Sequence, residues 1–134
     1  MILIDTSAWV DYLRGTSGTA TDAVRSRLAT RSDHVVMCEP IAAELLAGPT
    51  DEAVVTQIER LVNGLPSLEL DPVTDFRSAA LLHRAARRSG RTVRSLNGCL
   101  IAAIALRHDA VVLHKENDFD VLAEITALRV DSLL

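Results

Sequence analysis

The sequence predicts an α/β protein in which helices cover both faces of a parallel sheet. Short apolar runs rich in β-branched residues, such as Ile2 to Ile4, alternate with longer segments of helical periodicity. Strands that alternate with helices in this way pair in parallel and are buried on both sides. The chain has 134 residues and no repeat or linker, so we expect a single domain over residues 1–134.

Caps and stops define the elements of the first half of the chain. Thr6 or Ser7 follows the first strand and can cap a helix, which Gly15 ends. Pro40 suits the first position of a helix, because it has no N–H to leave unpaired there. We expect strands at residues 2–4 and 35–38, and helices at 7–14, 20–29, 41–47 and from Thr50 or Asp51 to Gly64.

Two long helical patterns dominate the second half. The first runs from residue 74 to 88, and its spacing places four apolar residues inward: Phe76, Ala80, Leu81 and Ala85. The second follows Ser95, a good N-cap, and is apolar almost all round, so we expect it to be buried. The expected elements are helices at 74–88, 96–107 and 119–125 and strands at 67–70, 110–114 and 128–131.

Composition argues against several classes of protein. Hydrophobic residues make up 49% of the chain and only four residues are aromatic, which predicts an ordered aliphatic core. No apolar run reaches the roughly 18 residues of a membrane span, and the first segment lacks the basic start of a signal peptide. We therefore expect a cytoplasmic protein. Cys38 and Cys99 are expected to be buried thiols rather than a disulfide, and the histidines show no zinc-binding spacing.

Charge is segregated along the chain. The net charge is −4, yet no Asp or Glu occurs between Arg77 and His108. This stretch is either a solvated helix face or a patch for a polyanion, because arginine matches phosphate with paired hydrogen bonds. On the second interpretation, five arginines would hold a phosphate backbone: Arg84, Arg87, Arg88, Arg91 and Arg94.

Acidic residues follow the apolar segments. Asp5 ends the first strand, Glu44 follows the second, and Glu116 and Asp118 follow the strand at 110–114. The carboxyl ends of parallel strands meet at one edge of a sheet, where ligands bind. Carboxylates gathered there need a cation, and oxygen ligands suit Mg²⁺. Taken singly, each acid has a structural alternative: a helix cap for Asp5 and Asp118, a surface position for Glu44 and a turn for Glu116.

Four short motifs resemble those of PIN-domain ribonucleases, and within these the VapC toxins of bacterial toxin–antitoxin pairs. They begin at Ile2, Pro40, Ser95 and His114, and they read ILIDTSAW, PIAAEL, SLNGCLIAA and HKENDF. The resemblance covers the whole chain. It implies a three-layer α/β/α sandwich with a central, mostly parallel sheet, Mg²⁺- or Mn²⁺-dependent cleavage of RNA, a VapB-like antitoxin that blocks the site, and a homodimer.

The resemblance also assigns roles to residues. Asp5, Glu44 and Asp118 would be metal ligands, Glu116 stands where many relatives have Asp, and Thr6 or Ser7 would orient Asp5. Gly98 departs from the pattern, because relatives carry an acid, usually Asp, at that position. Gly98 is either natural or an introduced change, and sequencing the native gene would distinguish the two. In either case we expect the catalytic set Asp5, Glu44, Glu116 and Asp118 to work with a weakened metal site.

The resulting functional prediction is a toxin ribonuclease that cuts structured RNA, with tRNA as the preferred substrate. The alternative is a non-catalytic PIN-fold module that binds RNA or an antitoxin without cutting. A phosphoacceptor receiver domain is a weaker alternative. Such domains need an acceptor Asp at the end of a central strand, but the strand at 35–38 is followed by Glu39-Pro40 and no other strand supplies one. The antitoxin is expected to meet an apolar strip on the N-terminal helices, formed by Trp9, Tyr12, Leu13, Leu45 and Leu46.

Overall fold

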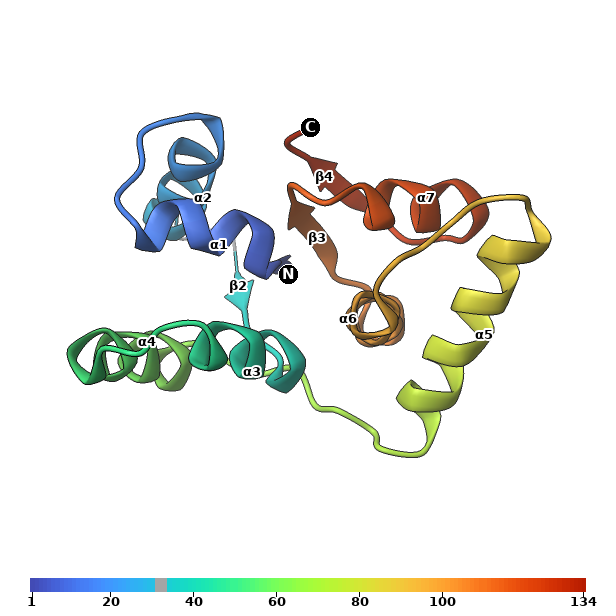
Figure 1. The fold of residues 1–134 in the computed structure, drawn as a ribbon, viewed down its shortest axis with the longest axis horizontal. Coiled ribbons are helices and arrows are strands. Elements are labelled where there is room, and N and C mark those ends of the chain that lie inside the picture. The colour runs from blue at the N-terminus through green and yellow to red at the C-terminus, as the bar shows by residue number, and fades with distance from the viewer. Residues whose placement is uncertain (31–33) are drawn as a thin grey trace.

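In the part of the chain that the structure describes, four strands form a parallel sheet that is the middle layer, in the order β2-β1-β3-β4 (Figure 1). The computed structural model describes residues 1–30 and 34–134. The strands are β1 (Ile2–Ile4), β2 (Val35–Val36), β3 (Val111–His114) and β4 (Val130–Ser132). The predicted parallel α/β class is therefore confirmed.

Helices cover the sheet on both faces, which gives the three layers α/β/α. In Figure 1, α1 and α2 lie on one side of the sheet and α6 lies on the other, with α5 outside it. The helices are α1 (Thr6–Leu13), α2 (Thr19–Ala29), α3 (Glu39–Ala47), α4 (Glu52–Gly64), α5 (Thr74–Arg88), α6 (Leu96–His108) and α7 (Asn117–Ile125).

The core is mostly aliphatic, as the composition predicts. The side chains of Leu3 and Ile4 in β1 and of Leu113 in β3 are fully buried, and α6 contributes a buried run from residue 98 to 105. Helix α6 is therefore the buried central helix that its sequence predicts. Cys38 and Cys99 are buried free thiols, and burial raises their pKa to about 12 and about 11.

The strand predicted at residues 67–70 is wrong. Only an isolated parallel bridge between Met37 and Ser67 forms there, supported by backbone bonds of Met37 to Pro66 and Leu68. The carbonyl of Glu69 instead accepts hydrogen bonds from Arg107 and His108. No ladder continues from this bridge, because the facing segment enters α3 (Glu39–Ala47) two residues after Met37.

The inward face predicted for α5 is also wrong. The helix buries Asp75, Ala79 and Ala86, whereas Phe76 and Leu81 are 54% and 55% exposed. Two causes act together. Arg107 draws the carboxylate of Asp75 inward, and the small alanines let α5 pack closely on α6, as few larger side chains would allow.

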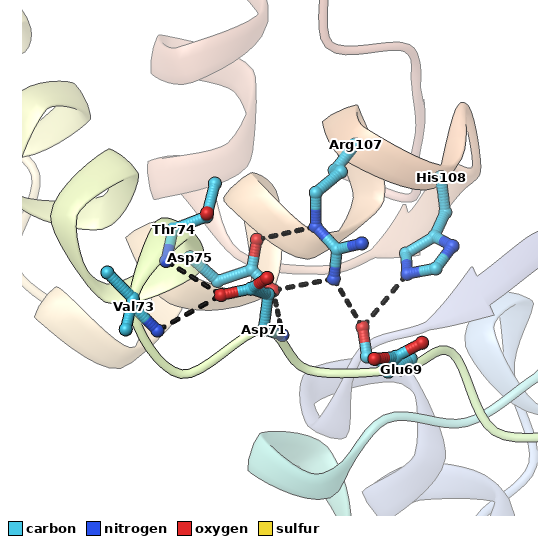
Figure 2. A network of polar contacts seen from close by, with 7 residues as sticks. All are labelled: Glu69, Asp71, Val73, Thr74, Asp75, Arg107 and His108. Carbon is cyan, nitrogen blue, oxygen red and sulfur yellow. Dashed lines mark hydrogen bonds and ion pairs between the residues drawn. The ribbon is translucent and has the colours of Figure 1, made fainter.

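A polar network joins the start of α5 to the end of α6 (Figure 2). Arg107 donates from Nε to Asp75 Oδ1 and from a terminal nitrogen to Oδ2, both at 2.8 Å. Asp75 Oδ2 also accepts the backbone N–H of Asp71, at 2.8 Å. The hydrogen bond from Arg107 is the largest of the effects that lower the pKa of Asp75, followed by an opposing effect of burial. The network therefore supplies stability that requires an ionised Asp75.

No helix in the described parts of the chain has the length and apolar character needed to cross a membrane.

Asp75→Asn is expected to lower the free energy of unfolding by about 1.5–3 kcal/mol at pH 7, the usual cost of removing a charged hydrogen bond. The folded pKa of Asp75 is lowered, so its contribution is present above the unfolded value near 3.8 and is lost as pH falls through the folded value. Urea unfolding at pH 7 and pH 3 measures this. The difference between the wild-type chain and the variant should shrink at pH 3.

Asp22→Asn is the matched control, because Asp22 pairs with Arg25 on an exposed surface where ion pairs contribute little. An equal loss of stability in both variants, or no loss in Asp75→Asn, would contradict the assignment.

Candidate active site

Four acidic side chains line one cavity of about 360 Å³ at the carboxyl edge of the sheet. Asp5 follows β1, Glu44 lies in α3, Glu116 follows β3, and Asp118 lies in the first turn of α7. They come from distant parts of the chain, and the parallel pairing of β1 with β3 brings them together. Thr6, Ser7, Arg94, Ser95 and Gly98 also line this cavity.

Asp5 is buried, with 5% of its surface exposed, and it caps α1. Its Oδ2 accepts hydrogen bonds from the backbone N–H of Ser7 at 3.0 Å and from Ser7 Oγ at 2.6 Å. Ser7 Oγ in turn accepts the backbone N–H of Lys115 at 2.9 Å, which links α1 to the residue that follows β3. Of the two residues predicted to orient Asp5, Ser7 does so.

Thr6 acts on Glu44 instead of Asp5. Its Oγ1 donates to Glu44 Oε1 at 2.9 Å. Partial burial raises the pKa of Glu44, and the negative charge of Asp5 raises it further, whereas hydrogen bonds from Thr6 and Asn97 lower it. A carboxyl with a raised pKa beside a second carboxylate is the situation that a bound cation relieves.

Asp118 is held by backbone donors at the approach to α6. Its Oδ2 accepts the N–H of Ser95 at 2.9 Å, and both of its oxygens lie 3.1 Å from the N–H of Arg94. Only 3% of Asp118 is exposed. The carboxylate therefore has a defined position, which it takes from the loop before α6 rather than from capping α7.

Glu116 is exposed, as Glu44 is, whereas Asp5 and Asp118 are buried. Its backbone N–H donates to His114 Nδ1 at 3.1 Å, and His114 is completely buried. His114 Nε2 lies 3.2 Å from Asp120 Oδ1, off the direction of a hydrogen bond, and Asp120 accepts from Ser132 Oγ at 2.9 Å. These contacts hold the turn from which the Glu116 side chain reaches the cavity.

Gly98 lies in the first turn of α6, where its N–H donates to Ser95 Oγ at 2.9 Å. A Cβ at this position would lie 4.0 Å from Asp118 Oδ2 and 3.4 Å from Ser95 Cβ. These are contacts that a side chain can make, and the position therefore has room for an acid directed beside Asp118.

The donor chemistry of the cavity fits a divalent cation, because all four acids supply oxygen. Across residues 1–30 and 34–134, however, no three His, Cys, Asp or Glu side chains stand close enough together to hold a metal ion. An acid at position 98 would add a carboxylate next to Asp118.

The structure divides the predicted arginine strip into two groups. Arg91 and Arg94 line a second hollow beside the acids, and Arg94 also reaches the acid cavity. Arg84 and Arg87 line a separate hollow with Leu96, and Arg88 is exposed. Sequence reasoning missed Asn97, which acts on Glu44; its place next to Gly98 in the first helical turn was the available signal.

The fold and the cavity define the class of this protein: a three-layer α/β sandwich with an acidic site at the carboxyl edge of a parallel sheet. The model of the family described as "PIN domain" matches residues 2–125. The chain is 56% identical over 132 residues to a VapC ribonuclease of Mycobacterium bovis and to Ribonuclease VapC11 of Mycobacterium tuberculosis, with 98% of each chain covered. The chain therefore belongs to the PIN domain family, as a VapC-type member.

Solved structures agree on the fold. The DNA-bound VapBC structure from Salmonella typhimurium superposes with a TM-score of 0.77 at 17% identity, covering 98% of this chain and 96% of that chain. The predicted membership of the family and the predicted three-layer fold are both confirmed.

Thr6→Val is expected to raise the pKa of Glu44 further, because the lost donor favours the ionised carboxylate. Thr6→Ser keeps the hydroxyl and should leave the pKa near that of the wild-type chain. A carbon-13 NMR titration of the glutamate side chains in metal-free protein measures both. An unchanged Glu44 pKa in Thr6→Val would show that this hydrogen bond does not act on the site.

Proposed function

We propose that this chain is the toxin of a toxin–antitoxin pair, a Mg²⁺- or Mn²⁺-dependent endoribonuclease that cuts structured RNA in the cytoplasm. The main observation in support is that four acids line one cavity, which adjoins an arginine-lined hollow: Asp5, Glu44, Glu116 and Asp118. The names of the relatives at 56% identity support a ribonuclease. We propose tRNA as the preferred substrate.

Asp5, Glu44 and Asp118 would hold the metal, and Glu116 lines the same cavity. A divalent cation at such a site lowers the pKa of water and offsets charge on a phosphate. Asp5 suits ligation or proton transfer, because its Oδ1 makes no hydrogen bond within the described residues. Asp118 uses both oxygens on backbone N–H groups, so its role is a fixed negative charge that binds metal directly or through water.

The five arginines would bind the RNA backbone at different distances from the acids. Arg94 stands at the acid cavity and Arg91 in the adjoining hollow, so these two would hold phosphates near the cut. Arg84, Arg87 and Arg88 lie farther along α5 and would hold phosphates beyond it. With only four aromatic residues in the chain, stacking contributes little, and RNA shape should dominate recognition.

A VapB-like antitoxin would bind a groove of about 240 Å³ between α1, α3 and α4. Leu13 and Leu45 of the predicted apolar strip line this groove, together with Val54 and Ile58. Trp9 is completely buried and belongs to the core, which corrects its place in the predicted strip. Thr6 and Glu44 line the groove too, so a segment bound there would reach the acid site.

The homodimer remains a prediction. Its support is apolar surface on and beside α5, where Val73, Phe76, Leu81 and Leu96 are each more than half exposed.

A non-catalytic module that binds RNA or an antitoxin is the second candidate. Gly98 and the absence of a three-ligand group among the described residues favour it for the chain in its present form. The two candidates differ in whether an acid at position 98 produces cleavage.

Gly98→Asp is expected to raise metal-dependent RNA cleavage by at least about 10- to 100-fold, the range that even supporting groups of a metal site contribute. The measurement is cleavage of total tRNA, and of ribosomal RNA in parallel, with Mg²⁺ or Mn²⁺ and with EDTA. End mapping should show 3′-hydroxyl and 5′-phosphate products, as for hydrolysis by in-line attack of water.

Gly98→Ala and Gly98→Asn are the matched controls. Alanine at a helical glycine should stabilise the fold by about 0.5–1 kcal/mol without adding a ligand, and asparagine has the shape of aspartate without its charge. Neither should gain cleavage. Failure of Gly98→Asp to cut either RNA would favour the binding module and overturn the ribonuclease proposal for this chain.

A further inference from the structure

A second hollow of about 510 Å³ lies directly beside the acid cavity. The two share Arg94, Glu116 and Asp118 in their walls, so they form one continuous surface depression at the carboxyl edge of the sheet. The second hollow extends past the acids to the loop between α5 and α6 and to the start of α7. An RNA strand with a phosphate at the four acids would place the neighbouring nucleotide in this hollow.

Polar side chains with unused hydrogen-bonding groups stand around this hollow. Thr92 and Asn117 are both exposed, and neither side chain makes a hydrogen bond to any other described residue. A hydroxyl and an amide each donate and accept, which is the chemistry that reads the edge of a nucleobase. Val121 supplies an apolar wall. A site for phosphate alone would need neither the amide nor the apolar wall.

Arg91 has a defined place in the hollow. Its guanidinium pairs with Glu124 of α7, which holds the loop after α5 against α7. Thr92 follows it directly in the sequence and Asn117 begins α7, so this ion pair spans the two sides from which the polar side chains come. The hollow is therefore a built feature of the α5–α6 loop and α7, with Arg91 and Arg94 positioned for the flanking phosphates.

We propose that this hollow binds the unpaired nucleotide next to the scissile phosphate, and that Thr92 and Asn117 select its base. The inference rests on the proposed ribonuclease function for the position of the cut, but the base-selective binding does not require catalysis. Thr92 and Asn117 are specificity-determining residues in this assignment, and the acids remain the catalytic group.

The first test measures binding without cleavage. Four fluorescein-labelled RNA tetranucleotides, each of a single base type, are titrated in EDTA with the Gly98 chain and with Thr92→Val and Asn117→Leu. Both altered residues are exposed, so the two variants should fold normally, and circular dichroism checks this. We expect one base to bind best, and each variant to weaken that complex about tenfold while the other three change little. Thr92→Ser should restore the preference.

Arg84→Ala is the contrasting variant, because loss of a backbone contact should weaken all four tetranucleotides alike. Uniform weakening by Thr92→Val and Asn117→Leu, or no effect of either, would overturn the base-selecting role.

The second test places the same substitutions in the Gly98→Asp chain and maps cut sites on a randomised RNA pool. Base preference on one side of the cut should relax, while preference at other positions stays. If Gly98→Asp cuts RNA but Thr92→Val and Asn117→Leu leave the preference intact, this inference alone fails. If Gly98→Asp does not cut and the tetranucleotides still bind selectively, the ribonuclease proposal fails and the nucleotide site stands.

Discussion

The parallel pairing of β1 with β3 is the constraint on which the rest of the site depends. Their register matches Ile4 with Leu113, and the Asp5 N–H continues the ladder to the Leu113 carbonyl at 2.9 Å. Both strands therefore end at the same level, and the residues that follow each one meet. Ser7 links the two strand ends, because its hydroxyl donates to Asp5 and accepts from the backbone N–H of Lys115. A slip of one residue would separate these partners.

The acids at this edge are held by short-range donors rather than by cations of the chain. Ser7 holds Asp5, Thr6 holds Glu44, and backbone N–H groups before α6 hold Asp118. Such hydrogen bonds orient carboxylates without neutralising them, so the site keeps its negative charge. That negative charge is the property a divalent ion needs. The same loop that positions Asp118 carries the arginines of the adjoining hollow.

Some expectations failed for reasons visible only in three dimensions. The apolar spacing of α5 predicted Phe76 and Leu81 inside, but the pairing of Asp75 with Arg107 set the rotation of the helix. The predicted arginines are close together in sequence, yet Arg91 and Arg94 line one hollow and Arg84 and Arg87 line another. Arg107, in the same acid-free stretch, is paired with Asp75. Periodicity measures hydrophobicity along one helix, and it contains no information about a partner 32 residues away.

The sequence by itself determined the alternation of strands and helices, the buried α6, and the acids at the ends of the strands, because local propensity, caps and parallel-sheet geometry act over short stretches. Together with its motifs it also predicted the family. The tertiary structure decided that Thr6 acts on Glu44, that Asp118 is held by the loop before α6, and that Thr92 and Asn117 face one hollow. Those relations join residues far apart in the chain, and only packing brings such groups within hydrogen-bonding distance.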